Sequence, residues 1–268
     1  MFADLSGSTA MSGTLPPEDL TRLTNQYLAY VVEQVEATGG YVDKFIGDAV
    51  MAMWNAPAPD PRHAASAIRA ALGAVARIRA EGDTARSRGE RSYSVKIGLN
   101  SGPAVVGNVG TERRYNYTAV GETVNVASRL ESVPGLYGCQ IVVGPRTAEL
   151  ARDEILLREL DWIQVKGREA PLAVFEPLGE RARATPDDVA RAQCFAEALA
   201  DYRARRFAEA AARWDKIATE NSQPGRERTL ADAGWPVGSA RTMAERARRF
   251  AAAPPSASWD GVLRLTSK

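Results

Sequence analysis

The chain has few of the residues on which many enzymes and secreted proteins rely. Its 268 residues include two cysteines and one histidine, which excludes a disulfide framework, a Cys/His zinc site and a Ser-His or Cys-His catalytic pair. Cys139 and Cys194 are far apart in the sequence, and we expect both to be reduced thiols, as in a cytoplasmic protein. No Walker-type phosphate loop, secretory signal or apolar run of roughly 18 residues is present, so we expect a soluble cytoplasmic segment.

An excess of charge of one sign is also missing. The 34 Lys and Arg residues nearly balance the 33 Asp and Glu residues, so no overall field favours nucleic acid or an anionic membrane as partner. The distribution is less even. Residues 1–180 carry 18 basic and 22 acidic residues, whereas residues 181–268 carry 16 and 11. This change from −4 to +5 predicts a domain boundary near Arg181.

Helix and strand patterns alternate in the first 180 residues. Pro16-Pro17 opens a helix with apolar residues at three- and four-residue steps, which Gly39-Gly40 ends. Further helices are predicted from Asp60-Pro61 and after Gly121. Strands are predicted at Met1–Leu5, Tyr41–Ile46, Ala49–Trp54, Tyr93–Asn100, Ala104–Val109, Gln140–Val143, Leu156–Gln164 and Leu172–Glu176.

The connections between these strands predict the fold class. Gly47-Asp48 reads as a tight hairpin turn, and Ser101-Gly102-Pro103 is expected to join a second strand pair. Only three residues precede Asp4, so we expect the first strand to be cut short, followed by a Ser/Gly turn at residues 6–9. The order strand–helix–strand–strand–helix–strand indicates an α+β fold of the ferredoxin-like kind.

The pattern changes after Arg181. Apolar residues from Phe195 to Tyr202 and from Phe207 to Ile217 predict two short amphipathic helices, similar to one tetratricopeptide hairpin. Residues 251–258 are rich in Ala, Pro and Ser, which indicates an extended or loosely ordered tail. We therefore predict a domain over residues 1–178 and a helical extension over residues 179–268.

Two carboxylates stand at strand ends beside glycine. Asp4 precedes Leu-Ser-Gly, and Asp48 follows Lys-Phe-Ile-Gly. Carboxylates placed at turns can converge on a hard cation such as Mg²⁺. Asp48 as a simple turn former is the alternative reading.

Four further side chains are candidates for binding an anion. Asn125 and Arg129 are four residues apart on a predicted helix, so both project from one face, although Arg129 paired with Glu131 would be unremarkable. Lys44 lies in the strand before Asp48, and Lys166 lies in Val-Lys-Gly-Arg. Both lysines could equally be ordinary solvated cations.

Five stretches form an ordered set of motifs: Phe2–Thr9, Tyr41–Pro57, Val95–Gly110, Tyr115–Ser132 and Val165–Phe175. The most specific parts are Tyr-Thr-Ala-Val-Gly-Glu-Thr-Val-Asn-Val-Ala-Ser-Arg-Leu-Glu at residues 117–131 and Lys-Phe-Ile-Gly-Asp at residues 44–48. Together they resemble the catalytic domain of class III adenylate and guanylate cyclases, in particular bacterial adenylate cyclases with threonine at the purine-specifying position. The resemblance covers residues 1 to about 178.

The resemblance implies a role for each candidate residue. It implies two Mg²⁺ or Mn²⁺ ions per site, held by Asp4, Asp48 and the Leu5 carbonyl. Lys44 and Thr118 would recognise adenine, and Lys166 the triphosphate. Asn125 and Arg129 would orient the ribose and steady the transition state.

The same resemblance implies the assembly and the setting. ATP would be converted to 3′,5′-cyclic AMP and pyrophosphate at sites shared by two subunits, and one chain with all the residues needs only a second copy of itself. The helical pair and the closing Trp259–Val262 resemble bacterial cyclases anchored in the membrane through an upstream sensor.

Three alternatives remain open from the residues. A catalytically impaired cyclase-like domain would bind nucleotide or partners without turnover. A diguanylate cyclase is disfavoured because its Gly-Gly-Asp/Glu-Glu-Phe hairpin is absent and Lys44 is wrong for guanine. A scaffold would act through the C-terminal helices.

Overall fold

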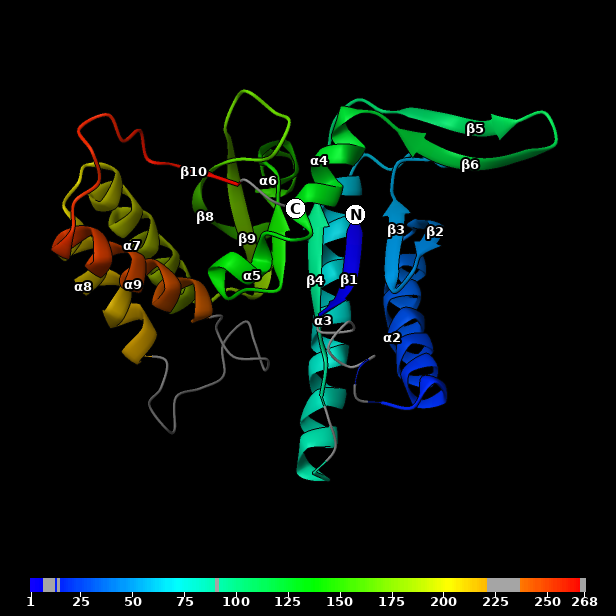
Figure 1. Ribbon diagram of the computed structural model, residues 1–268, viewed down its shortest axis with the longest axis horizontal. Coiled ribbons are helices and arrows are strands. Elements are labelled where there is room, and N and C mark those ends of the chain that lie inside the picture. Colours follow the sequence, from blue (N-terminus) through cyan, green and yellow to red (C-terminus); the bar gives the residue numbers. More distant parts are fainter. Residues whose placement is uncertain (7–12, 14, 90–91, 221–236, 266–268) are drawn as a thin grey trace. The chain divides into compact units, whose positions relative to one another are not determined.

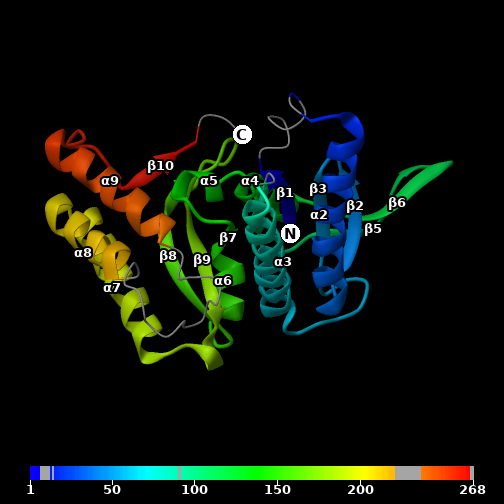
Figure 2. The same cartoon turned by 90° about the horizontal axis from the view of Figure 1, so that it is seen from below.

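The computed structural model describes residues 1–6, 13, 15–89, 92–220 and 237–265. The chain divides into two compact units, the first of residues 1–132 and 140–151 and the second of residues 133–139 and 152–268. Their helices and strands are labelled in Figure 1 and seen from another side in Figure 2. The Ser/Gly turn predicted at residues 6–9 lies almost wholly outside the described residues. No helix in the described part of the chain is both long and apolar enough to cross a bilayer.

The first unit contains strands in the order β7-β4-β1-β3-β2. All neighbours are antiparallel except β4 and β7, which are parallel. The succession β1–α2–β2–β3–α3–β4 confirms the predicted α+β, ferredoxin-like fold class. The elements are β1 (Phe2–Ser6), α2 (Pro17–Ala37), β2 (Tyr41–Ile46), β3 (Ala49–Met53), α3 (His63–Ser87), β4 (Ser94–Leu99), β7 (Ile141–Val143) and α6 (Pro145–Ala151).

The two long helices of this unit are amphipathic, as their sequences predict. On α2, Tyr27, Val31 and Val35 are fully buried at four-residue steps. The chain leaves α2 through Gly39, whose φ of 74° lies in the left-handed region that favours glycine. On α3, the buried face consists mainly of alanine, with Ile68 and Ile78 as its largest side chains.

The segment after β4 corrects one prediction. The expected pairing of Tyr93–Asn100 with Ala104–Val109 is wrong, because β5 (Val105–Thr111) pairs instead with β6 (Arg114–Val120) in a separate two-stranded sheet. The connection is tied to the following helix, where Asn100 Nδ2 donates to the Thr123 carbonyl and Thr123 Oγ1 to the Pro103 carbonyl. The hairpin therefore projects from the unit as an arm, which Figure 1 shows. We call residues 105–120 the arm.

The second unit combines three strands with a group of helices. β8 pairs antiparallel with β9 and parallel with β10. The predicted helical pair corresponds to α7 and α8, and α9 is a further helix that the sequence reading missed. The elements are α5 (Pro134–Tyr137), β8 (Ile155–Gln164), β9 (Leu172–Glu180), the 3₁₀ turn η1 (Arg181–Arg183), α7 (Pro186–Arg203), α8 (Phe207–Glu220), α9 (Gly238–Ala252) and β10 (Val262–Arg264).

The C-terminal segment is more ordered than its composition suggests. The sequence predicts an extended or loosely ordered stretch at residues 251–258, whereas α9 continues to Ala252 and Arg205 donates to the carbonyls of Pro255 and Ser256. Just beyond it, Trp259 packs against Tyr202, Phe207 and Phe250, with ring centroids 5.2–5.7 Å apart. The apolar face of α9 consists of alanines and one methionine, and many of the other residues are arginines. Since large apolar residues do not recur at three- and four-residue steps, the sequence pattern did not indicate this helix.

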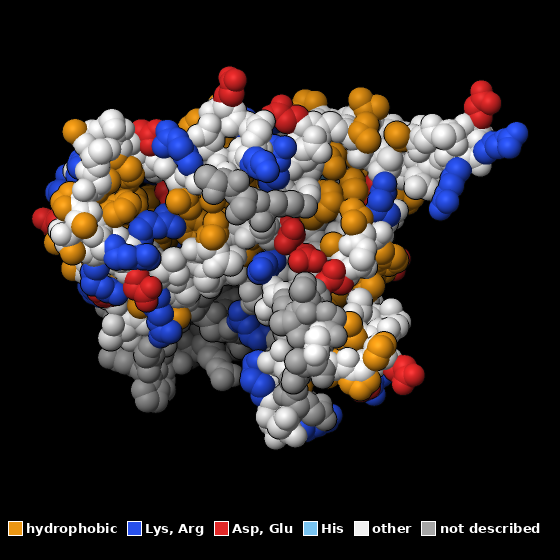
Figure 3. Space-filling view, in the orientation of Figure 1, with side chains coloured by type: hydrophobic (Ala, Val, Ile, Leu, Met, Phe, Trp, Pro, Cys, Tyr) orange, Lys and Arg blue, Asp and Glu red, His pale blue; other side chains and the backbone are white. Residues whose placement is uncertain are grey.

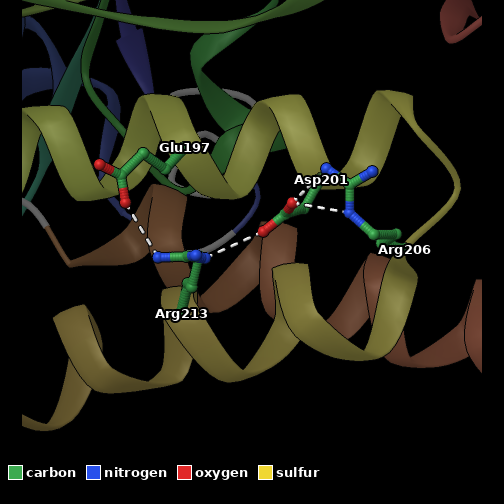
Figure 4. Close-up of polar contacts among 4 residues, drawn as sticks. All are labelled: Glu197, Asp201, Arg206 and Arg213. Atoms are coloured by element: carbon green, nitrogen blue, oxygen red, sulfur yellow. Dashed lines mark hydrogen bonds and ion pairs between the residues drawn. The ribbon is translucent and has the colours of Figure 1, made fainter.

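An ion-pair network joins α7 to α8 (Figure 4). Arg206 donates from Nε and Nη2 to Oδ1 of Asp201, at 3.0 and 2.6 Å, while Arg213 Nε donates to Oδ2 at 2.9 Å. Arg213 also reaches Glu197, at 2.9 Å from Nη1 to Oε2. The hydrogen bonds from Arg206, followed by those from Arg213, lower the pKa of Asp201 below its ordinary value.

Asp201→Asn should therefore destabilise the helical extension in a pH-dependent way. Because the pKa of Asp201 is lowered by folding, its contribution is fully present above the ordinary aspartate pKa of about 4 and is lost as the pH falls through the folded-state pKa. The thermal midpoint of the variant should lie below wild type at pH 7, and the difference should shrink below about pH 4. Asp153→Asn is the control, since that side chain is 94% exposed. A difference that is constant with pH would contradict the role of the Asp201 charge.

Candidate active site

The sheet register brings the two predicted metal-binding aspartates to the same end of neighbouring strands. β1 and β3 pair through Phe2↔Met51 and Ala3↔Val50. Asp4 follows Ala3 on β1, and Asp48 stands in the turn just before β3 begins at Ala49, so both lie toward the same end of this antiparallel pair. Residues separated by more than 40 positions in the sequence thus lie at one edge of the sheet because of backbone pairing.

Buried polar atoms without partners occur on β1, on α2 and in the turn between β2 and β3. Among the described residues, Ser6 Oγ, Tyr27 Oη and Asp48 Oδ2 are buried and have no hydrogen-bond partner. Burial raises the pKa of the Tyr27 hydroxyl well above its usual value, and the fields of Asp4 and Asp48 raise it further. Buried polar atoms left without partners in a protein call for an ion or water.

The donors at this edge fit a hard divalent cation. Carboxylate and carbonyl oxygens, here from Asp4, Asp48 and Leu5, are the ligands that Mg²⁺ and Mn²⁺ take. Over the described ranges, no group of three or more His, Cys, Asp or Glu side chains could by itself hold a metal ion. A cation bound here would complete its coordination with water or substrate oxygens, as Mg²⁺ usually does in proteins.

Lys44 and Thr118 meet at a third residue, Asp43, which the sequence reading did not single out. The Asp43 side chain is fully buried, and Lys44 Nζ lies 3.3 Å from its Oδ1. The Thr118 hydroxyl donates to Oδ2, and the amide N–H of Ala119 approaches the same oxygen at 3.4 Å. One carboxylate on β2 thus joins the two residues predicted to recognise the purine.

A β-bulge explains how adjacent residues can share this junction. β2 pairs with β3 through Val42↔Ala52 and then Lys44↔Met51, which leaves Asp43 as the extra residue. In a regular strand, neighbouring side chains point to opposite faces, whereas a bulge redirects a side chain locally. Close by, the rings of Tyr41 and Tyr117 meet edge to face at 5.7 Å.

Asn125 and Arg129 lie on α4 (Glu122–Leu130), whose buried face consists of Val126, Ala127 and Leu130. Asn125 is exposed and Arg129 is half-buried. Because Arg129 is only half-buried, part of its guanidinium can contact an anionic ligand.

Lys166 belongs to the second unit rather than the first. It is exposed in the turn that joins β8 to β9. The residues that the first unit brings together are thus Asp4, Leu5 and Asp48 at one sheet edge, and Lys44 with Thr118 at Asp43.

This ferredoxin-like fold, with two aspartates toward one end of neighbouring strands, is the arrangement that the resemblance to nucleotide cyclase catalytic domains implies. Residues 1–175 match the family model for the adenylate and guanylate cyclase catalytic domain, and the chain belongs to this family. The predicted class III resemblance is thereby confirmed.

Curated relatives resemble the same part of the chain. Adenylate cyclase 1 of Rhizobium meliloti (strain 1021) is 37% identical over 179 residues, which cover 67% of this chain and 27% of the relative. An adenylate cyclase of Anabaena cylindrica is 35% identical over 185 residues, covering 66% of this chain and 36% of the relative. The chain therefore spans only about a quarter to a third of these relatives.

Solved structures show the same fold. The adenylyl cyclase CyaB from P. aeruginosa is 31% identical with a TM-score of 0.62, over 67% of this chain and 92% of that chain. The guanylyl cyclase Cya2 is 29% identical with a TM-score of 0.59, over 67% and 90%. Because the chain is similar both to an adenylyl cyclase and to a guanylyl cyclase, the fold does not distinguish ATP from GTP as substrate. Only the residues of the site can indicate which nucleotide is preferred.

Close packing of α4 on the sheet should be essential. A Cβ added to Gly98 on β4 would lie 2.2 Å from the Glu131 nitrogen and 2.6 Å from the Ala127 carbonyl oxygen. Gly98→Ala should displace α4, lower the free energy of unfolding by about 1–3 kcal/mol and reduce activity. Thermal unfolding and cyclase assays would measure both.

Gly107→Ala is the matched control, because a Cβ there would meet nothing within 4 Å. Its thermal midpoint should stay close to wild type. Equal midpoints for the two variants would show that α4 tolerates the extra methyl group and would refute the packing argument.

Proposed function

We propose that this chain is an adenylate cyclase, which converts ATP to 3′,5′-cyclic AMP and pyrophosphate as a homodimer with two Mg²⁺ or Mn²⁺ ions per site. The observation that carries the choice of ATP is the pairing of Lys44 and Thr118 at Asp43. Adenine N1 accepts a hydrogen bond, as a lysine ammonium requires, whereas guanine N1 carries a hydrogen. Such a donor–donor conflict costs on the order of 1–3 kcal/mol.

We assign the remaining candidate residues to metal binding, to orientation of the ribose and to charge stabilisation. Asp4, Asp48 and the Leu5 carbonyl would hold the cations. When bound, these ions lower the pKa of the ribose 3′-hydroxyl and neutralise phosphate charge. Asn125 would orient the ribose, and Arg129 and Lys166 would balance the charge that develops on the phosphoryl oxygens and pyrophosphate.

The arm supports a second copy of the chain as partner. Val105 and Tyr115 are 69% and 61% exposed, and Val106, Val109 and Val120 are exposed as well. Apolar side chains are visible where the arm leaves the unit in Figure 3. A two-stranded hairpin alone is marginally stable, and an exposed apolar surface of this kind favours association. We propose that a second copy covers it, so that each site takes Asp4 and Asp48 from one subunit and Lys44, Thr118, Asn125 and Arg129 from the other.

We further propose that residues 1–178 form the catalytic domain and residues 179–268 a helical extension. The family match ends at residue 175, and α7 to α9 follow with their own aromatic cluster. Because ATP is the substrate, we place the domain in the cytoplasm, as part of a signalling enzyme.

The purine choice is tested by product analysis. With Mg²⁺ or Mn²⁺ and equal ATP and GTP, the purified protein should form cyclic AMP in clear excess over cyclic GMP. Asp48→Ala should abolish both products while leaving the protein folded. Equal or reversed yields would refute the assignment to ATP, and a folded, dimeric wild type without any product would favour a catalytically impaired nucleotide-binding domain.

The shared site is tested by mixing two inactive variants. Asp48→Ala removes a metal ligand and Arg129→Ala removes the charge on α4, so each homodimer should be nearly inactive. In a mixed dimer one site carries both lesions and the other carries neither. Random exchange makes half of the dimers mixed, so about a quarter of wild-type activity should return.

The control mixes Asp48→Ala with Asp4→Ala, two lesions that fall on the same side of every site. No activity should return in that mixture. If subunit exchange is demonstrated and the first mixture also stays inactive, the site is not shared between subunits.

A further inference from the structure

The buried carboxylate of Asp43 occupies the junction between β2 and the arm. Its Oδ2 accepts from the Thr118 hydroxyl and lies 3.4 Å from the Ala119 nitrogen, and its Oδ1 faces the Lys44 ammonium at 3.3 Å. The side chain itself has no exposed surface. A buried carboxylate is costly unless it is paired, so these contacts define its arrangement.

We propose that Asp43 is a positioning residue that sets the purine specificity, because it fixes the hydrogen-bonding roles of Thr118 and Lys44. This inference rests on the proposed cyclase function and extends it to a residue that does not itself touch the nucleotide.

Asp43 fixes the direction in which the Thr118 hydroxyl donates. A threonine hydroxyl has one hydrogen and two lone pairs, and it rotates to suit its partners. An ionised carboxylate only accepts, so the hydrogen must point to Asp43. Thr118 can then only accept from a ligand. The 6-amino group of adenine is a donor and matches, whereas O6 of guanine is an acceptor and does not.

Lys44 is fixed by the same carboxylate. Its side chain is 34% exposed, so the ammonium lies at the surface with one side against Asp43. Oδ1 has no hydrogen-bond partner among the described residues, which leaves the charge of Lys44 as its compensation. The N–H groups of the ammonium can donate to adenine N1. Lys44 thus offers a donor to N1 and Thr118 offers an acceptor to the 6-amino group, which is the pattern that adenine requires.

The bulge makes this arrangement specific to position 43. Asp43 is the unpaired extra residue of β2, so it can turn toward β6 while Lys44 keeps its place opposite Met51. A residue in a regular strand could not serve both contacts, because its neighbour would face the other side of the sheet.

The test compares Asp43→Asn with wild type for ATP and GTP, in kcat/KM and in the affinity for analogues of both nucleotides that lack the 3′-hydroxyl and so cannot cyclise. The amide can donate to the Thr118 oxygen, which frees the hydroxyl to donate to guanine. The ratio of kcat/KM for ATP over GTP should fall about tenfold or more, mainly through a higher KM for ATP. An unchanged ratio in a folded variant would overturn the proposal.

A double-mutant cycle separates positioning from general disruption. Thr118→Val lacks the hydroxyl that Asp43 orients, so adding Asp43→Asn to it should change the ratio by much less than in wild type. Fully additive effects would show that Asp43 does not act through Thr118. If Asp43→Asn does not fold, Asp43→Ser, which is smaller and admits water, takes its place in the cycle.

Tyr41→Leu is the control for the same junction. It removes the contact with Tyr117 but keeps the carboxylate, so it should affect ATP and GTP alike. A similar fall in its ratio would mean that the packing of the arm, and not Asp43, sets specificity. The analogue affinities remain informative even without turnover, so a wild type that forms no product refutes the proposed function separately from this inference.

Discussion

Backbone hydrogen bonds on the two sides of β1 are the constraint on which the first unit depends. This strand pairs with β3 on one side and with β4 on the other. The first pairing brings Asp48 beside the strand that carries Asp4 and Leu5. The second places Gly98, opposite Phe2, under α4, which carries Asn125 and Arg129. A shift of one residue in either register would turn these side chains to the wrong face of the sheet.

The contacts that we propose for purine specificity lie next to the surface that we propose for dimerisation. Asp43 and Tyr41 on β2 contact Thr118 and Tyr117 on the arm. The arm is also the exposed apolar surface for which we propose a second copy as partner. A change in how the arm rests on β2 would therefore alter purine recognition and dimerisation together, because both depend on the same few contacts.

The second unit is held by a different balance of forces. Arg158 and Glu176 form an ion pair with side chains only 1% and 4% exposed, and Ser239 on α9 donates to the same carboxylate. A buried pair of this kind is costly to break, since removing one partner leaves an unpaired charge. The ion pairs of Asp201, whose arginine partners are about half exposed, contribute less because solvent screens them. The buried network therefore contributes more to holding α9 in place than the half-exposed ion pairs contribute to the packing of α7 on α8.

The sequence by itself determined the fold class and the helices with clear apolar faces, because the spacing of apolar residues and the residues that form turns are local signals. It also determined the family, because the motif at residues 117–131 is specific. It did not determine that β5 leaves β4 to pair with β6, because no strand was predicted over residues 114–120 and only the folded chain shows this pairing. It also missed α9, whose buried face consists of small residues. Asp43 beside Lys44 looked like ordinary strand alternation, because a bulge leaves no local signal. Only the folded chain joined that carboxylate to Thr118, 75 residues away.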